Sequence, residues 1–303
     1  MKYLSPKLDI VFKKMFGDVN NSDMLRDLVK AYLGVDATGK FELSNTEITP
    51  VELDRKFARL DLKISTRTEV IDIEVQIANQ PDYNDRSIYY WAALYASTVG
   101  KGDEYNNSKT TLSLNILDFK MFDCDDFNTN FTFYDPKNGL SLSDKARISF
   151  IELPKVREIT PEQIKSDERI AWAAFFNASR EEDFDMLDRI TENPNVQKAV
   201  TIIRELSADE KVQEEARKRE EALLNERWAL SAAKRDALAE GRAEGKAEGI
   251  AEGKAEGLSM MANALRAMGM DERDIEEAVL RAQGIEPERD AVDENEGNEE
   301  WES

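Results

Sequence analysis

The chain has 303 residues, of which 41% are hydrophobic, so it can bury a substantial core in one or two domains. The complete absence of histidine excludes Ser-His-Asp and Cys-His triads, imidazole bases and histidine-bound metals. The net charge of −21 argues against a uniformly basic surface for nucleic acid.

The negative charge is unevenly distributed along the chain. Residues 1–150 contain 19 Lys and Arg against 23 Asp and Glu, a net charge of −4, whereas residues 151–303 contain 22 against 39, a net charge of −17. The first half could therefore still present a local basic surface to DNA.

The composition predicts a cytoplasmic protein. No stretch approaches the roughly 20 apolar residues that cross a bilayer, and the first residues are charged where a signal peptide is apolar. The single cysteine, Cys124, cannot form an internal disulfide, which suits a reducing compartment. Its acidic neighbours favour a surface position over a nucleophilic role.

Two short helices are predicted at the N-terminus. Ser5 followed by Pro6 has the pattern of a helix start, apolar residues follow at helical spacing, and Gly17 ends the run. Ser22 and Gly34 bound a second helix in the same way.

The pattern then changes to strands. From Phe41 to Ile77 the hydrophobic residues recur with a period of about 2 instead of 3.6. A helix rich in aromatic residues is predicted over Asn84–Val99. Three later segments resemble strands, the last two with a weaker signal: Thr110–Phe119, Asn130–Tyr134 and Ala146–Leu153.

After Pro154 the pattern is helical. Thr160 and Ser207 each begin a capping-box pattern, and the second predicts one long charged helix that ends near Ala239. The segment Gly241–Gly257 has a glycine every four residues, and each glycine costs about 1 kcal/mol in a helix relative to alanine. Two alternatives stay open for it: a helix that needs a partner for its small-residue surface, or a flexible tether.

A hairpin in the first half brings two acids together. If Leu60–Ile64 pairs with Ile71–Ile77 around a turn at Arg67, apolar residues share one face and polar residues the other. In that register Asp61 lies directly across from Glu74, with Cβ atoms about 5 Å apart.

Two ionised carboxylates at that distance repel each other unless a cation is shared or a pKa is raised. Oxygen ligands select hard cations, so Mg²⁺, Mn²⁺ or Ca²⁺ is the expected cofactor. Such an ion could bind a phosphate and activate a water without any histidine. The alternative is a sheet with one solvated face, on which Asp61 and Glu74 only pair with Lys63 or Arg59.

Several motifs in the first half occur in the order and spacing of a known family. They are D-x-x-F-K-x-x-F-G from Asp9, R-x-D from Arg59, I-E-V-Q from Ile73, R-x-x-x-Y from Arg86, and G-D-E-Y followed by L-N-I-L-D-F up to Phe119. With the acid, the hairpin and the E-x-Q strand, residues 1–155 resemble PD-(D/E)XK nucleases, and in particular the Rpn family of recombination-promoting nucleases and transposases. The glycine-glutamate repeat is similar to tails in that family.

The resemblance implies an α/β fold: a restriction-endonuclease-like core, with a mixed sheet flanked by helices, followed by an all-helical C-terminal region with a long helix and an acidic tail. We therefore expect a nuclease-like domain in residues 1–155 and a helical region in 156–240. The four-residue repeat occupies 241–257 and a short helical segment 258–285. A disordered acidic tail is expected in 286–303, which has little apolar content.

The same resemblance assigns roles to individual residues. Asp61 and Glu74 would be metal ligands, Asp9 could add a third acid, and Gln76 would stand where relatives have a lysine that orients or activates water. A neutral amide could orient a water but could not lower its pKa by charge. Lys63 could offer a substitute charge, although an ion pair with Asp72 is the simpler expectation.

DNA is the expected partner. The candidates for phosphate contact are Lys7, Lys13, Lys14, Arg55, Lys56, Arg59, Arg67 and Arg86, which would position a duplex without reading its sequence. Three hypotheses follow: a Mg²⁺- or Mn²⁺-dependent DNA endonuclease of low specificity; a weak or inactive nuclease fold that binds DNA or assembles complexes; and a long helix that makes homo-oligomers.

Overall fold

The computed structural model describes residues 3–36, 42–44, 47–48, 58–59, 61–80 and 82–286. It divides the chain into two compact units, Met1–Leu223 and Leu224–Ser303. The expected tail at 286–303 lies outside the described residues, except for Glu286. Among the helices of the described part, none combines the length and the apolar character that a membrane crossing requires.

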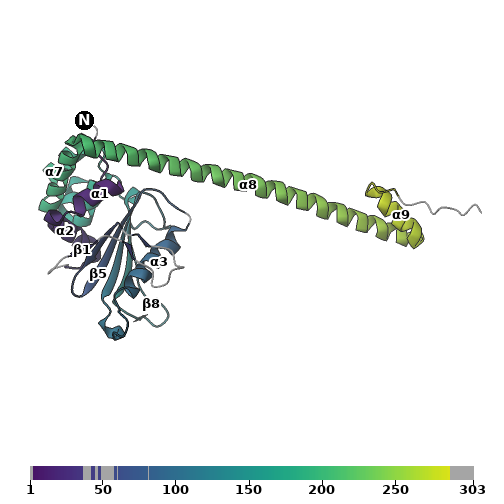
Figure 1. Cartoon of the computed structure of the whole chain (residues 1–303), viewed down its shortest axis with the longest axis horizontal. Coiled ribbons are helices and arrows are strands. Elements are labelled where there is room, and N and C mark those ends of the chain that lie inside the picture. Colours follow the sequence, from purple (N-terminus) through teal and green to yellow (C-terminus); the bar gives the residue numbers. More distant parts are fainter. Residues whose placement is uncertain are drawn as a thin grey trace, which may run out of the picture. The chain divides into compact units, whose positions relative to one another are not determined.

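The first unit is built on a six-stranded sheet with the order β1-β4-β5-β6-β10-β7 (Figure 1). Its pairs β5–β6 and β6–β10 are parallel and the others antiparallel, which confirms the expected mixed sheet. Its strands are β1 Glu42–Ser44, β4 Leu62–Ser65, β5 Glu69–Gln76, β6 Thr110–Leu117, β7 Asn128–Phe131 and β10 Ala146–Glu152. Two small sheets pair β2 Glu47–Ile48 with β3 Ala58–Arg59, and β8 Tyr134–Asp135 with β9 Leu140–Ser141.

The central hairpin has the register that its hydrophobic pattern predicts. Leu62 pairs with Ile73, Lys63 with Asp72, and Ile64 with Ile71. Because side chains alternate between faces, the apolar residues of β4 and β5 share one side of the sheet and the polar residues share the other.

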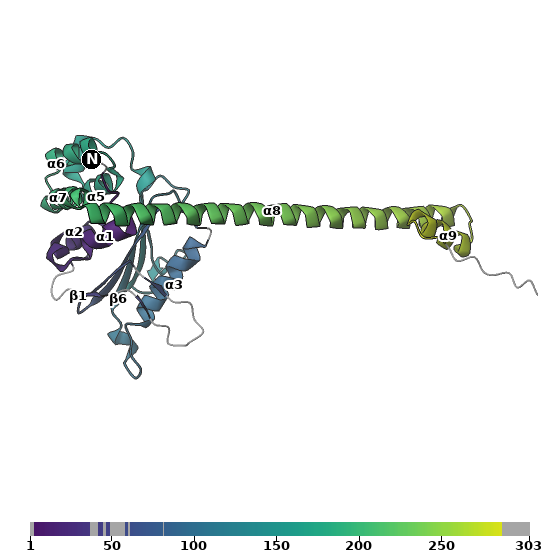
Figure 2. The ribbon, with the colours of Figure 1, turned by 45° about the horizontal axis from the view of Figure 1, so that its top comes forward.

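Helices from both ends of the first unit cover the apolar side of the sheet (Figure 2). One continuous apolar cluster joins sheet residues such as Ile71 and Leu114 to Phe16 and Trp172. The helices are α1 Asp9–Phe16, α2 Ser22–Leu33, α4 Pro161–Ser166, α5 Glu168–Asn177, α6 Glu181–Ile190 and α7 Pro194–Ala208, with short 3-10 turns at Val19–Asn21, Tyr105–Asn107 and Leu153–Lys155. This cluster contains residues from both sides of position 155. The expected boundary between a nuclease-like domain in 1–155 and a helical region in 156–240 therefore stays a prediction.

Helix α3, Tyr83–Ala96, covers the other side of the sheet (Figure 2). Its own residues Tyr83, Trp91 and Leu94 are buried. The polar residues of β5 are therefore enclosed: Asp72 is 0% exposed and Glu74 is 5% exposed. The alternative of a solvated polar face was wrong, because an aromatic helix packs over that face.

Two helices begin at other residues than the sequence predicts. Helix α1 begins at Asp9 rather than at Pro6, with Leu8 as its N-cap. The Ser207 hydroxyl accepts from the Leu4 backbone N–H instead of capping a helix, and the Asp209 carboxylate accepts from the first N–H groups of the long helix. A side chain that binds another segment is not available as a cap.

The long helix α8 runs from Glu210 to Ala267, and α9 follows at Glu272–Ala282. The repeat at Gly241–Gly257 is helical, which decides between the two alternatives left open by its sequence. Val212 and Ala216 are the buried residues of α8, and both lie in its first two turns.

Candidate active site

Asp61 and Glu74 face each other at the open end of the β4–β5 hairpin. The Asp61 backbone N–H donates to Glu74 Oε1 at 2.9 Å, and the Val75 N–H donates to Asp61 Oδ2 at 3.1 Å. Each carboxylate thus binds the backbone of the opposite strand, just beyond the last ladder pair at Leu62 and Ile73. This reciprocal pairing holds the two acids side by side.

A lysine from α1 completes the pairing of Asp61. Lys13 Nζ lies 2.9 Å from Asp61 Oδ1, so both oxygens of this carboxylate are engaged. Lys63 lies across the ladder from Asp72, and its charge favours the ionised form of Asp72 by lowering the pKa of that carboxyl. The cation that binds Asp61 is thus Lys13, 48 positions away in the sequence, and not a neighbour on the sheet.

Asp72 and Glu74 share one buried face of β5 and perturb each other. The pKa of Asp72 is raised to about 8, mainly by burial and also by the charge of Asp61, while a hydrogen bond from Ser113 opposes the shift. Burial also raises the pKa of Glu74 well above its ordinary value, with the charges of Asp72 and Asp61 acting in the same direction. Both carboxyls therefore hold their protons more tightly than free carboxyls do, and a divalent cation would favour their ionised forms in place of those protons.

A chain of hydrogen bonds connects α3 to this acid cluster. The Tyr83 hydroxyl donates to Asn115 Oδ1 at 2.8 Å, Asn115 Nδ2 donates to Ser113 Oγ at 3.2 Å, and Ser113 Oγ donates to Asp72 Oδ2 at 3.2 Å. The other oxygen, Asp72 Oδ1, is buried and has no hydrogen-bond partner. Since orphaned buried oxygens are costly, this one marks a place where a ligand would gain binding energy.

Arg86 on α3 brings a second positive charge near the acids. Its guanidinium lies 4.7 Å from the Tyr83 ring centroid, and its charge lowers the pKa of Glu74. The Arg86 Nε and Nη2 atoms are buried and have no hydrogen-bond partner. Two unsatisfied donors of a fixed charge suit an anion such as a phosphate oxygen.

The donor set fits a hard divalent cation held by two carboxylates. Mg²⁺ is commonly bound by one or two carboxylates together with water and substrate phosphate, and Asp61 with Glu74 supplies that number. A third acid from α1 does not join them: both oxygens of Asp9 accept from Arg219 Nε, at 3.0 and 3.1 Å. No cluster of three or more Asp, Glu or Cys side chains arranged for a metal occurs in the described ranges.

The sequence profile of the family described as PD-(D/E)XK nuclease family transposase matches residues 6–233. The chain belongs to this family. Searches of curated proteins and of solved structures found no match. The PD-(D/E)XK assignment confirms the expected fold class, and it implies DNA as the substrate of the family's chemistry.

The other residues predicted for the PD-(D/E)XK site lie in several places. Gln76 ends β5, half-buried on the same face as Asp72 and Glu74, and its backbone carbonyl accepts from Asp118. Lys7 pairs with Asp118 at 2.8 Å, and Lys14 pairs with Glu215 at 3.0 Å. Arg67 is exposed in the hairpin turn, about 20 Å along the strand from the acids.

Three predicted DNA contacts cannot be placed at side-chain level. Arg55 and Lys56 lie outside the described residues. Arg59 is described only through the backbone of β3, where it pairs with Glu47.

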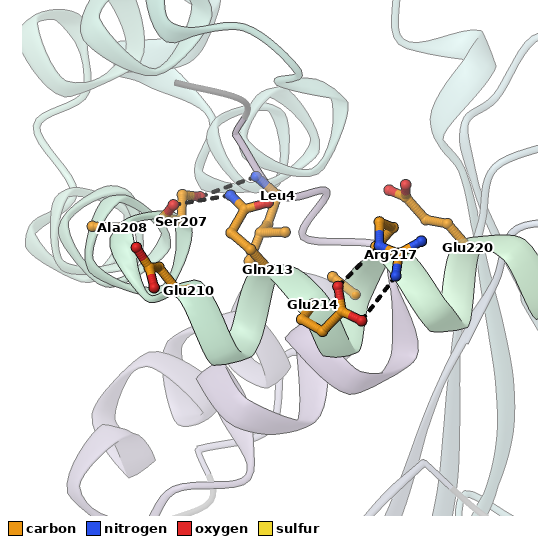
Figure 3. Close-up of a pocket in the computed structure, with 9 residues that line it drawn as sticks. Leu4, Ser207, Ala208, Glu210, Gln213, Glu214, Arg217 and Glu220 are labelled. Carbon is orange, nitrogen blue, oxygen red and sulfur yellow. Dashed lines mark hydrogen bonds and ion pairs between the residues drawn. The ribbon is translucent and has the colours of Figure 1, made fainter.

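The pocket in Figure 3 is separate from the acid cluster. It lies between the N-terminal segment and the start of α8, where the Leu4 N–H donates to Ser207 Oγ and Arg217 pairs with Glu214. Its lining includes no member of the acid cluster.

Sequence reasoning missed the polar layer that surrounds the acids. The alternation in Thr110–Leu117 places Thr111, Ser113 and Asn115 on one face, and all three are buried. A polar stripe on a strand that is buried on both sides was the available signal, because such strands are usually apolar throughout.

Asp72→Asn is expected to stabilise the metal-free protein, increasingly so as the pH rises. The folded state keeps the Asp72 proton up to a pKa of about 8, whereas the unfolded chain releases it near 3.8. Folding then takes up a proton, so stability falls between those pH values, by as much as ~1.4 kcal/mol per pH unit for one proton. Urea unfolding in EDTA should show a difference between variant and wild type that grows from about pH 5 to pH 8. A constant difference would contradict the prediction.

Proposed function

We propose that this protein is a Mg²⁺- or Mn²⁺-dependent DNA endonuclease that hydrolyses phosphodiester bonds with low sequence specificity. The facing carboxylates of Asp61 and Glu74 are the observation on which the proposal rests. Glu74 is buried and Asp61 is partly buried at the open end of the β4–β5 hairpin, where their repulsion favours a bound divalent cation. Ca²⁺ would suit the same oxygen ligands without being the preferred catalytic ion.

Asp61 and Glu74 would hold the cation, which supplies Lewis acidity to a phosphate and lowers the pKa of a bound water. Gln76, two residues beyond Glu74 on the same face of β5, would orient the attacking water through its amide. Arg86 would bind a phosphate oxygen through Nε and Nη2, its two unpartnered nitrogen atoms. Hydrolysis adds water across one P–O ester bond, so one product end has a phosphate and the other a hydroxyl.

The predicted DNA contacts are to phosphate and not to base edges, which supports cleavage with little sequence preference. The candidates whose side chains the structure describes are Lys7, Lys13, Lys14, Arg67 and Arg86. The family description as a transposase supports a role in DNA recombination or transposition. The expected cytoplasmic location is part of this proposal.

A supercoiled plasmid tests the proposal directly. Purified protein with Mg²⁺ or Mn²⁺ should convert the plasmid to nicked and linear forms, and EDTA should prevent the conversion. The neutral Gln76 favours the second candidate, a nuclease-fold module that binds DNA or assembles complexes without efficient cleavage. A protein that shifts duplex DNA on a gel but leaves the plasmid supercoiled with either ion would support that candidate and overturn the first.

The long helix supports a homo-oligomer as the working form. From Leu224 onward no residue of α8 is buried, and Trp228 and Leu238 are 66% and 56% exposed. A helix gains most of its stability from packing an apolar face, which this segment lacks within one chain. The repeat contributes a surface at Gly241–Gly257 on which an added Cβ would meet nothing within 4 Å. A second copy of α8 would cover these side chains and bring two nuclease units to one duplex.

Removing residues 224–303 is expected to convert an oligomer into a monomer. The first unit, Met1–Leu223, contains the apolar core and the acid cluster, so the truncated chain should keep its fold. Light scattering coupled to size exclusion would report both masses, and near-UV circular dichroism would report the packing of the core. A truncated chain with the same subunit number as the full chain would rule out assembly through α8.

A further inference from the structure

We infer that Lys13 of α1 supplies the positive charge of the candidate active site that Gln76, as a neutral amide, cannot supply. This inference rests on the proposed nuclease function and adds a residue to it. Lys13 Nζ lies 2.9 Å from Asp61 Oδ1, at the carboxylate that would hold the cation and hence beside the scissile phosphate. An ammonium at that place stabilises the negative charge that phosphodiester hydrolysis develops.

The buried residues of α1 hold the backbone of Lys13 in this position. The α1 residues Val11, Phe12, Met15 and Phe16 are 0% exposed, so the helix cannot turn about its axis. The side chain of Lys13 is itself 37% exposed, which leaves its ammonium accessible to a substrate. A rigid backbone with a reachable head group is the arrangement that phosphate binding requires.

An alternative partner for Lys13 is already occupied. Asp9 lies four residues earlier on the same face of α1, where an intrahelical ion pair would ordinarily form. Arg219 at the start of α8 takes both oxygens of Asp9 instead. Lys13 pairs with Asp61 and not with Asp9.

The two cations near the acids are on different elements. Arg86 acts from α3 beside Glu74, whereas Lys13 acts from α1 beside Asp61. A phosphate bound between them would have positive charge on two sides, which favours binding of its negative charge. Lys63 lies across from Asp72 and so faces a different acid.

Lys13→Gln tests the inference, with Lys198→Gln as its matched control. Lys198 lies on α7, is 33% exposed, and pairs with Asp23 at 2.7 Å, so it has similar exposure and an acidic partner outside the candidate active site. Lys13→Gln should slow plasmid cleavage by roughly tenfold or more. It should also bind Mn²⁺ more tightly in calorimetry without DNA, by about threefold or more, because an ammonium no longer competes for Asp61. Lys198→Gln should change neither quantity.

A structural role for Lys13 would not raise metal affinity while it lowers cleavage, so the opposite directions are diagnostic. Lys13→Arg should recover most of the cleavage rate, since it retains the charge. If the wild type cleaves DNA and Lys13→Gln cleaves it at a rate within about threefold of the wild-type rate, the inference is overturned and the proposed function stays intact. A wild-type protein that neither binds Mn²⁺ nor cuts DNA would overturn both.

Discussion

Glu74→Gln is expected to lower metal-dependent DNA cleavage by on the order of 10³-fold, equivalent to ~4 kcal/mol of barrier. The substitution removes one of the two carboxylates that would hold the cation, whereas its amide oxygen can still accept from the Asp61 N–H. The fold should therefore persist. Plasmid cleavage at saturating metal measures the effect, and Asp61→Asn should give a loss of similar size.

Glu69→Gln provides the control on the same strand. Glu69 begins β5 at the turn end of the hairpin, where it interacts with Thr66 and lies outside the acid cluster. The Glu69→Gln variant should cleave plasmid DNA at the wild-type rate. Because burial raises the pKa of Glu74, removing its charge should leave the melting temperature of Glu74→Gln at or above that of the wild type. Undiminished cleavage by Glu74→Gln or Asp61→Asn would remove this site from consideration.

Trp172→Ala is expected to destabilise the first unit by about 3–5 kcal/mol. Trp172 is 0% exposed on α5, its ring lies 5.7 Å from Phe16, and its indole N–H donates to Asp27 at 2.8 Å. The substitution opens a cavity between the N-terminal helices and the later helices of the unit, and it leaves Asp27 with one donor fewer. Chemical unfolding should be followed by near-UV circular dichroism, since α8 dominates the helical signal.

Trp172→Phe separates the two causes. It keeps most of the ring packing and loses the hydrogen bond, so a smaller loss of about 1–2 kcal/mol is expected. Both variants should unfold in a single transition, because one apolar cluster joins the sheet to the helices on both sides of residue 155. A sheet that stays folded after the helices of Trp172→Ala have unfolded would contradict this cooperativity and support a separate domain at 1–155.

The acid pair shows how far pattern alone could lead. The alternation of apolar residues in the hairpin predicted its register, because a shift of one residue would move every apolar side chain to the other face. That register placed Asp61 across from Glu74. The burial of Asp72 and Glu74 could not be predicted in the same way, because the helix that covers them is held by contacts of Trp91 and Leu94 with the sheet.

Of two capping patterns in the sequence, one predicted its helix start correctly and the other did not. The pattern that begins at Thr160 predicted a capping box that the structure confirms, since no other segment binds the Thr160 hydroxyl. The similar pattern at Ser207 was wrong, because Ser207 lies in the last turn of α7 and its hydroxyl accepts from the Leu4 N–H, 203 positions away. Local rules hold where a side chain has only local partners.

By itself the sequence determined which chemistry is open to this protein and which residues share a strand face. The lack of histidine restricts hydrolysis to carboxylates, lysine, hydroxyls or a carboxylate-bound metal, and a period of 2 sets the faces of β4 and β5. Only the tertiary structure decided which cation meets Asp61. Lys13 reaches it because the buried side of α1 packs on the core, a contact between segments far apart in the chain that periodicity does not encode.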